Sequence, residues 1–237
     1  MKPKSKIPRI LIQFPTMGRE KKFKEALKAY LKFMDDKENF FIHVVCEESD
    51  PVMMDTKMMD WIYKQHENIF ISYDTNSTKI AAVNYGLHDP VFMDFCGEWD
   101  ILLLASDDMI PEVQGYDNII RGVYADGDLD RVAHFDDGHQ GENLNTLSIL
   151  GKTYFDRFGY IYNPVYISLY ADNEFMEVSH KLGKAVYIPQ CIIRHKHVDL
   201  DASLNDSVYE HNAQFLKQDF QAYNQRRLSN FDLPEGT

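Results

Sequence analysis

Paired cysteines, long apolar runs and an excess of basic residues are all missing from this sequence of 237 residues. Its three cysteines, Cys46, Cys96 and Cys191, are odd in number and far apart, which indicates reduced thiols and a cytoplasmic location. No apolar run approaches the ~20 residues that a membrane-spanning helix needs, so we expect no membrane span. The basic start MKPKSKIPRI lacks the apolar segment of a signal peptide.

The charge balance argues against one class of nucleic-acid-binding protein. Acidic residues number 37 and basic residues 25, which gives a formal net charge of −12. A protein that binds duplex DNA through its overall charge would carry the opposite sign. The sequence leaves open the alternative of a local basic face that binds nucleic acid. The candidate residues for this face are Lys152, Arg157, Lys181, Lys184, Arg194 and Lys196.

Several well-known nucleotide and hydrolase motifs are absent as well. Gly18 stands alone after the first predicted strand, where a dinucleotide-binding GxGxxG would need three glycines. The segment Gly151-Lys152-Thr153 ends like a P-loop, but Thr146 occupies the position of the required first glycine. The chain also has no GxSxG and no HExxH, which argues against an α/β-hydrolase and a zinc protease.

What is present is enough apolar material for one large core. Apolar residues make up 44% of the chain, which predicts a single domain over residues 1–237. Buried strands are expected at residues 9–14, 40–46, 69–73 and 100–104. Helices are expected at residues 23–34 and 58–66, and a third helix starts at a cap formed by Ser77 or Thr78. This alternation indicates an open α/β sheet, mostly parallel at first.

The second half of the chain has a less regular pattern. Short strands are expected at residues 131–135, 147–150, 185–188 and 191–195. A helix is expected at residues 172–182, with Asp172 in its first turn, where the helix dipole favours a carboxylate. A final amphipathic helix spans roughly residues 206–226, within a C-terminal element at 205–228.

Unusual residues follow directly after the predicted strands. They form the segments Pro15 to Arg19, Cys46 to Asp50 and Ala105 to Asp108. Ligands of open α/β sheets bind at the carboxyl ends of the strands. We therefore expect these three segments to surround one crevice.

Asp107 and Asp108 are the strongest candidates for metal chemistry. Two adjacent carboxylates repel each other unless a positive group lies beside them, and oxygen ligands suit Mg²⁺ or Mn²⁺. The alternative is a solvated turn. His195 and His197, two residues apart on a predicted strand, point to the same face. Imidazole beside carboxylate fits Mn²⁺ better than Mg²⁺.

In this order and spacing, the segments resemble the GT-A glycosyltransferases, especially their inverting family-2-like branch, over roughly residues 9–198. Pro15-Thr16-Met17-Gly18-Arg19 resembles the first-strand turn P-T-Y-N-R of that family. Val44 to Asp50 resembles the second-strand turn V-V-D-D-G-S-x-D, with Cys46 at the first acid and Glu47 as the expected base contact. Ala82 to Gly86 resembles A-R-N-x-G, with Val83 in place of arginine.

The later segments extend this resemblance. Ile101 to Asp108 resembles the strand that leads to D-x-D-D, with Ala105 at the first acid. Gly151 to Tyr160 resembles the acceptor-side segment, and Tyr170 to Glu174 resembles the E-D-x-E/D segment at a helix start. His195, together with His197, resembles the late metal-ligand histidine of many GT-A enzymes.

The resemblance implies a GT-A fold, which is a Rossmann-like open mixed sheet flanked by helices. Its nucleotide-sugar-binding half would cover residues 9–110 and its acceptor half residues 111–200. The implied reaction moves a sugar from a nucleotide-diphosphate donor, by resemblance a UDP-sugar, to an acceptor hydroxyl, with Asp172 as the base of an inverting displacement. The implied ligands of Mn²⁺ or Mg²⁺ are Asp108, His195 and His197. The implied donor contacts are Pro15, Thr16, Arg19, Glu47, Lys79, Asn84, Ser106 and Asp107.

The segment from His134 to Thr146 has a composition that suggests a metal cluster, because it contains Asp136, Asp137 and His139 as well. We expect it to be a flexible acceptor-side loop, with a second metal site as the alternative. Trp99 is expected in the core. The expectation for Tyr160, Tyr162 and Tyr166 is also core packing, with stacking on a sugar as the alternative.

Two other functions stay open at this stage. A sugar nucleotidyltransferase of this fold would carry a glycine-rich first turn of the form G-x-G-T-x-R, which this chain lacks. A catalytically degenerate nucleotide-sugar-binding protein would account for Ala105 and Val83, but the retained Asp107, Asp108 and Asp172 argue against decay. The acceptor stays open among a saccharide, a protein side chain, a lipid-linked glycan and a hydroxylated base in phage DNA.

Overall fold

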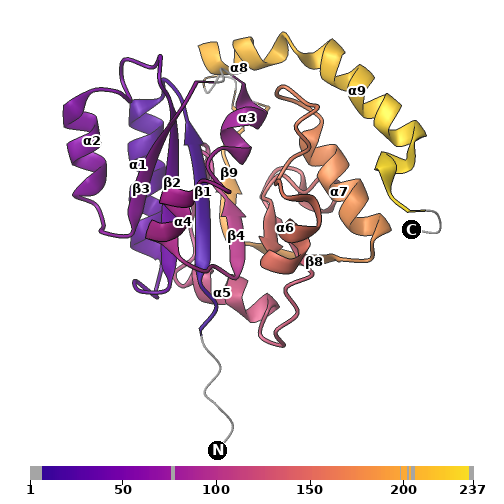
Figure 1. Ribbon diagram of the computed structural model, residues 1–237, viewed down its shortest axis with the longest axis horizontal. Coiled ribbons are helices and arrows are strands. Elements are labelled where there is room, and N and C mark those ends of the chain that lie inside the picture. The colour runs from indigo at the N-terminus through magenta and orange to yellow at the C-terminus, as the bar shows by residue number, and fades with distance from the viewer. Residues whose placement is uncertain (1–6, 76–77, 198, 202, 204–205, 235–237) are drawn as a thin grey trace, which may run out of the picture.

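The computed structural model describes residues 7–75, 78–197, 199–201, 203 and 206–234. A central sheet of seven strands carries helices on both faces (Figure 1). In spatial order the strands are β3 (Ile69–Asp74), β2 (Phe40–Glu47), β1 (Ile10–Thr16), β4 (Ile101–Leu104), β7 (Ile149–Gly151), β6 (Val132–Asp136) and β8 (Ala185–Cys191). A separate pair consists of β5 (Met109–Pro111) and β9 (Ile193–His195).

The sheet is parallel in its first half and mixed in its second. β1 pairs in parallel with both β2 and β4, and β2 pairs in parallel with β3. β7 runs antiparallel to β4 and β6, and β8 returns parallel to β6. The register places Thr16 opposite Cys46, and Cys46 opposite Tyr73. The ends of β1, β2 and β3 therefore open at the same edge.

Each face of the sheet has its own apolar core. On β1, Ile10, Ile12 and Phe14 belong to one core, while Leu11 belongs to the other, as the two-residue period of a strand requires. The first core is covered by α1 (Glu20–Phe33), α2 (Thr56–Tyr63) and α5 (Tyr116–Val123). The second is covered by α3 (Lys79–Asn84), α4 (Pro90–Cys96), α6 (Lys152–Phe158), α7 (Ala171–Lys181) and α9 (Leu216–Leu228).

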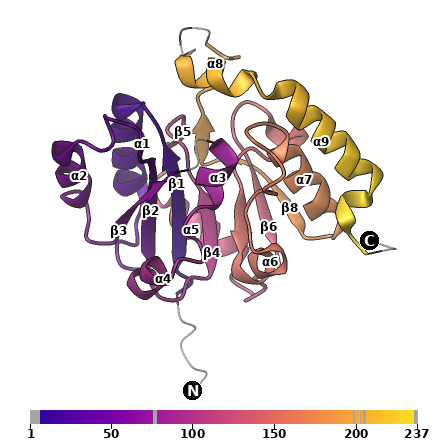
Figure 2. The ribbon, with the colours of Figure 1, turned by 45° about the horizontal axis from the view of Figure 1, so that its top comes forward.

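One further helix, α8 (Ser207–Ala213), lies across the end of the molecule between α3 and α9 (Figure 2). The final amphipathic pattern predicts one continuous helix, and this prediction is wrong. Gln214 N–H bonds to His211 O, and Phe215 N–H bonds to Asn212 O. These bonds span three residues instead of four, so the helix tightens and ends before α9 begins.

The other predicted elements of the first half are confirmed, with small shifts at their ends. Thr78 caps α3 by accepting the Ala81 N–H at 3.2 Å, whereas Ser77 lies outside the described residues. α4, β5, α5 and α6 were not predicted. Trp99, Tyr162 and Tyr166 are buried, as expected of core aromatics.

The segment that resembles a P-loop needs its glycine, Gly151, for a structural reason. It ends β7 and begins the turn into α6. A Cβ atom at this position would lie 2.2 Å from the Leu129 carbonyl oxygen, so the close approach of two backbones requires glycine. The role of Gly151 is to allow a sharp turn.

A buried polar chain crosses the parallel strands. His43 Nδ1 lies 2.8 Å from Gln13 Oε1, and its Nε2 lies 2.8 Å from Ser72 Oγ. The ring stacks on Phe92 at 4.0 Å between centroids. Gln13 Nε2 donates onward to the Tyr85 carbonyl at 3.0 Å, which joins the strands to the turn after α3. Burial lowers the pKa of His43 to about 3, although Asp89 opposes this.

Candidate active site

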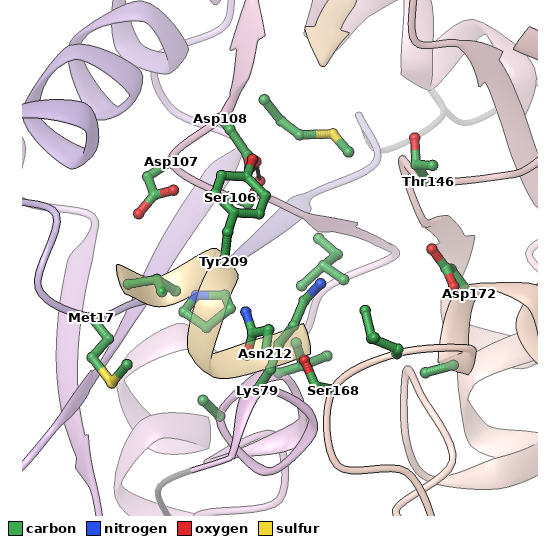
Figure 3. A pocket seen from close by; sticks show the side chains of 18 of the residues that line it. Met17, Lys79, Ser106, Asp107, Asp108, Thr146, Ser168, Asp172, Tyr209 and Asn212 are labelled. Carbon is green, nitrogen blue, oxygen red and sulfur yellow. Dashed lines mark hydrogen bonds between the residues drawn. The ribbon is translucent and has the colours of Figure 1, made fainter. Parts of the chain in front are cut away.

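A cavity of about 670 Å³ opens at the carboxyl ends of β1 to β4 (Figure 3). This is the edge at which open α/β sheets bind ligands, and the volume is within the ~300–1,000 Å³ of small-molecule sites. α8 forms one of its walls and the start of α7 another. Among the described residues, the predicted site residues that line it are Pro15, Thr16, Arg19, Glu47, Lys79, Ser106, Asp107, Asp108, Asp172, His195 and His197.

Asn84 was predicted as a donor contact, but it does not line the cavity. Its Nδ2 donates to the Tyr162 carbonyl at 2.7 Å, and its Oδ1 accepts the Ile161 N–H at 2.9 Å. Both ends of the amide are therefore used to fasten α3 to the segment after α6. Asn84 supports the cavity wall from behind.

The adjacent acids lie beside a buried arginine. Arg19 Nη1 contacts Asp107 Oδ1 at 2.9 Å and lies 3.9 Å from Asp108 Oδ2. The side chain of Arg19 is 10% exposed and that of Asp107 is 7% exposed. Asp108 accepts further hydrogen bonds from Ser106 Oγ and, at 2.6 Å, from Tyr209 Oη. The positive group that the acid pair requires is therefore present within the chain.

The two acids differ in their electrostatics. Burial raises the pKa of Asp107 to about 6, against the opposing field of Arg19. Burial would also raise the pKa of Asp108, but the charge of His195 and hydrogen bonds from Ser106 and Tyr209 outweigh it and lower that pKa. Asp108 is therefore the carboxylate that stays ionised over the wider pH range.

α8 is fastened to the same arginine. Asp206, its N-cap, accepts from Arg19 Nη2 at 2.6 Å and from Lys22 Nζ at 2.7 Å. The Tyr209 ring lies 4.6 Å below the Arg19 guanidinium carbon in a cation–π contact. Burial would raise the pKa of Asp206, but the hydrogen bonds from Arg19 and Lys22 lower it to about 2.

His195 and His197 lie together at the cavity, as the sequence predicts, with their ring centroids 5.0 Å apart. His195 Nδ1 contacts Asp137 Oδ2 at 3.2 Å, which leaves Nε2 as the nitrogen free to bind a ligand. Burial and the neighbouring His195 lower the pKa of His197. Its imidazole is therefore neutral near pH 7.

The segment expected to be a flexible acceptor-side loop is held by one buried carboxylate. Asp137, which is 1% exposed, accepts the N–H groups of His139 at 2.9 Å, Gln140 at 2.7 Å and Gly141 at 3.2 Å. Thr146 Oγ1 donates to its other oxygen at 2.6 Å. His139 and Gln140 consequently reach the cavity in a defined position.

Asp172 lies across the cavity from the acid pair (Figure 3). It stands in the first turn of α7, two residues after Tyr170, which adopts a left-handed conformation with φ of 62°. The Tyr170 ring packs against Phe220 at 5.3 Å and Tyr223 at 5.4 Å, so aromatic contacts with α9 hold this turn.

The segment before α7 is fixed from the same helix. Asp219 of α9 is fully buried and accepts three backbone N–H groups, those of Ile167 at 2.9 Å, Ser168 at 2.8 Å and Leu169 at 2.7 Å. Ser168 and Leu169 line the cavity. A carboxylate on the C-terminal helix therefore shapes the wall next to Asp172.

Three cavity-lining residues carry buried polar atoms without a hydrogen-bond partner among the described residues: Thr16 Oγ1, Arg19 Nε and Ser168 Oγ. A buried polar atom that stays unpaired costs roughly 1–3 kcal/mol. A polar ligand in the cavity would remove this cost.

Sequence reasoning missed some of the lining residues. Asp74 is buried at the end of β3, where the strand-end rule would have found it. Tyr209 of α8 also lines the cavity, and Asp206, the N-cap of that helix, contacts Arg19; no local signal points to these contacts with residues near position 19. His139 was noted for its composition, but its neighbours could not be read from the sequence.

The basic residues that form a candidate nucleic-acid face are mostly paired with acids. Arg157 and Lys184 both contact Asp130, at 2.6 and 2.7 Å. Arg194 contacts Glu112 at 2.8 Å, and Lys152 contacts Asp156. These pairs reduce the positive field that such a face would present to a phosphate backbone.

No protein-family model and no curated protein sequence matches the chain. Solved structures do match it. The mannosyltransferase PcManGT from Pyrobaculum calidifontis, in complex with GDP-Man and Mn²⁺, aligns with 81% of this chain and 58% of its own, at a TM-score of 0.63 and 13% identity. The chain has a GT-A-like glycosyltransferase fold.

Two further structures agree with this fold. S. aureus TarS aligns with 80% of this chain and 37% of its own, at a TM-score of 0.61 and 13% identity. TarS 1–349 in complex with UDP aligns with 78% of this chain and 60% of its own, at a TM-score of 0.60 and 13% identity. The chain thus spans less than two thirds of each of these neighbours, and the GT-A-like fold is what the likeness shows.

No helix within the described part of the chain is both long enough and apolar enough to cross a bilayer.

Proposed function

We propose that this protein is a glycosyltransferase that moves a sugar from a nucleotide-diphosphate donor to an acceptor hydroxyl. One observation carries the proposal: in a GT-A-like fold, a single cavity has the acid pair Asp107-Asp108 with Arg19 on one wall and Asp172 on another. A charged diphosphate beside the acid pair and a general base at Asp172 would then share one space. Structures of similar fold bind GDP-Man, UDP and UDP-GlcNAc.

The donor would lie along the β1 to β4 edge. Lys79 and Arg19 line this part of the cavity and would attract the diphosphate, while Glu47 and Thr16 lie near the strand ends expected to hold the nucleoside. The unpaired polar atoms of Thr16, Arg19 and Ser168 give such a donor hydrogen-bond partners. We propose a UDP-sugar as the donor.

The side chains of the cavity include ligands that are compatible with a divalent metal. Asp108 stays ionised, and because Nδ1 of His195 contacts Asp137, His195 would bind the ion through Nε2 once that nitrogen has given up its proton. One carboxylate and one imidazole, completed by diphosphate oxygens and water, form a set that suits Mn²⁺ or Mg²⁺. When bound, the ion would neutralise negative charge on the departing diphosphate.

The chain's own residues would perform the remaining steps. Asp172 would accept the proton of the acceptor hydroxyl as that oxygen attacks the anomeric carbon. Arg19 would offer its guanidinium to the departing diphosphate, because a cation placed where charge develops stabilises the transition state. A single displacement of this kind inverts the anomeric configuration.

The test is calorimetric titration of UDP into the full chain, with and without Mn²⁺, and repeated with GDP. We expect Mn²⁺-dependent binding that Asp108→Ala weakens at least ~10-fold, because it removes the ionised carboxylate. Asp172→Asn is the matched control. It should bind the nucleotide within about twofold of the wild type, yet lose ~10²–10⁴-fold in transfer rate.

Either of two results would contradict the proposal. Absence of binding for UDP, GDP, dTDP and CMP alike would remove the donor site. Binding without any slow hydrolysis of the matching sugar nucleotide in Mn²⁺ would favour the alternative, a nucleotide-sugar-binding protein without catalysis.

A further inference from the structure

A second group of potential metal ligands, which does not include the acid pair, contains two residues that line the cavity, His139 and His197, and one that does not, Asp199. Among the described residues, His139, His197 and Asp199 each place one ligand atom within 4.8 Å of the others. His139 belongs to the loop after β6, whereas His197 and Asp199 follow β9. His139 Nε2 lies 3.6 Å from Asp199 Oδ2, and His197 Nδ1 lies 3.2 Å from the same oxygen.

The hydrogen bonds of the two imidazoles show which nitrogens carry lone pairs. His139 Nε2 accepts from the Gln140 amide at 2.9 Å, and His197 Nδ1 accepts the Asp199 backbone N–H at 3.2 Å. A nitrogen that accepts a hydrogen bond has no proton to donate to a carboxylate. Both nitrogens are therefore unprotonated, and each would exchange its present hydrogen bond for a bond to a cation held beside the Asp199 carboxylate.

The surroundings hold these side chains in place. The His139 and His197 rings stack at 5.0 Å with an angle of 15° between their planes. Asp137 fixes the backbone N–H of His139 and also contacts His195 Nδ1. Asp137 thus positions His139 through its backbone, whereas its contact with an imidazole ring is to His195, outside this group. Asp199, at 65% exposure, leaves the site open to solvent.

We propose that His139, His197 and Asp199 form a site for a divalent transition metal, distinct from the site at Asp108 and His195. His197, which the family resemblance implies as a ligand beside Asp108 and His195, is thereby assigned to this second site. Two imidazoles and one carboxylate are a donor set for Zn²⁺ or Co²⁺, with water in the remaining position. The ion ties the loop after β6 to the segment after β9. This inference goes beyond the proposed transferase function, because none of the three residues is among the expected contacts of the nucleotide donor.

The test uses Co²⁺ as a spectroscopic probe of the full chain after treatment with a chelator, with no nucleotide present. We expect one equivalent of Co²⁺ to produce a visible absorption band that Zn²⁺ abolishes by competition. His139→Ala and Asp199→Asn should each weaken Co²⁺ binding at least ~10-fold, because each removes one of three protein ligands. His180→Ala, which changes an exposed histidine of α7, should bind within about twofold of the wild type.

Thermal unfolding gives a second readout. Zn²⁺ at a hundredfold excess over its dissociation constant should raise Tm by roughly 5–10 °C in the wild type and not in His139→Ala. Equal melting of the two proteins without metal shows that the variant folds. Co²⁺ binding lost in Asp108→Asn but kept in His139→Ala would overturn the proposal, as would no binding at millimolar Co²⁺. Failure of UDP and GDP to bind would instead contradict the transferase function alone.

Discussion

At the scale of single residues, His43 sits in the parallel sheet with no carboxylate partner. Its Nδ1 donates to Gln13 and its Nε2 accepts from Ser72, so the neutral ring satisfies both neighbours. Protonation would place a second proton against the Ser72 hydroxyl and bury a charge between Phe92 and the strands. The imidazole consequently resists protonation until the protein unfolds.

This resistance predicts acid sensitivity. The pKa of His43 is about 3 in the folded chain, against 6.5 as the ordinary value, so the unfolded chain binds one more proton between these limits. Stability is therefore full above pH 6.5 and falls as pH drops towards 3. From pH 7.5 to 5 we expect a loss of about 2 kcal/mol in the free energy of unfolding, measured with urea.

The matched variants are His43→Gln, which removes the titrating group, and His180→Gln, which removes an exposed one. The first should lose most of this pH dependence, at a lower overall stability, and the second should keep it. Identical slopes in the wild type and His43→Gln would contradict the assignment.

At the scale of elements, α8 is fastened mainly through charge to the wall of the cavity that contains Arg19 and Asp108. Asp206 accepts from Arg19 and Lys22, and Tyr209 donates to Asp108. None of the helix's own described residues is buried, so these polar contacts do the anchoring. A diphosphate that enters beside Arg19 must compete with the Asp206 carboxylate for the same guanidinium.

Asp206→Asn should therefore loosen α8. Asparagine preserves the N-cap but removes the charge, so the loss reports on the ion pairs alone. With a pKa of about 2 when folded against 3.8 ordinarily, Asp206 stabilises the protein above pH 3.8 and loses this effect as pH falls towards 2. We expect a loss of about 2 kcal/mol at pH 7 in urea unfolding, shrinking below pH 4.

The comparison for this prediction is Asp60→Asn, an exposed acid of α2. It should change stability by no more than about 0.5 kcal/mol. Equal stability of Asp206→Asn and Asp60→Asn at pH 7 would mean that α8 is not held by these pairs.

At the scale of the whole molecule, one sheet runs through both predicted halves. β4 of the first half pairs with β7 of the second, and the core that contains Leu102 also contains Leu150 and Val132. α9 adds a long-range link, because Asp219 holds the segment before α7. The halves share an interior and have no separate cores.

This continuity predicts a single unfolding transition for residues 1–237. Tryptophan fluorescence reports the first half, through Trp61 and Trp99, and far-ultraviolet circular dichroism reports the whole chain. The two signals should give coincident urea curves. Fluorescence that changes at a clearly different urea concentration from the dichroism would show two domains that unfold independently.

The first-half strands could be predicted because parallel strands buried on both faces appear as continuous apolar runs. β5 is three residues long, which is too short for a period to show, whereas the strands expected at residues 147–150 and 191–195 overlap β7 and β9 with shifted ends. The break between α8 and α9 has no glycine or proline to mark it. In these places tertiary contacts determine the backbone, and one sequence contains little trace of them.

The crevice itself was predictable, since the strand-end rule brings Arg19, Glu47 and Asp108 to one edge. The partner of the acid pair was not. The charge of the acid pair indicated a metal. The structure also places Arg19 against Asp107, and Arg19 in turn contacts Asp206, which lies 187 positions after it in the chain. Contacts over such separations depend on the finished fold. The placement of His139 beside His197 is another contact of this kind.

The left-handed turn at Tyr170 is held by residues of α9, which is synthesised after it. Tyr170 leads into the helix of Asp172, and its ring rests on Phe220 and Tyr223, about 50 positions later in the chain. A non-glycine residue in this conformation is unfavourable by roughly 1–2 kcal/mol unless its surroundings hold it. During translation those surroundings do not yet exist when Asp172 is made. The proposed base therefore acquires its final orientation only after α9 has been synthesised and has docked.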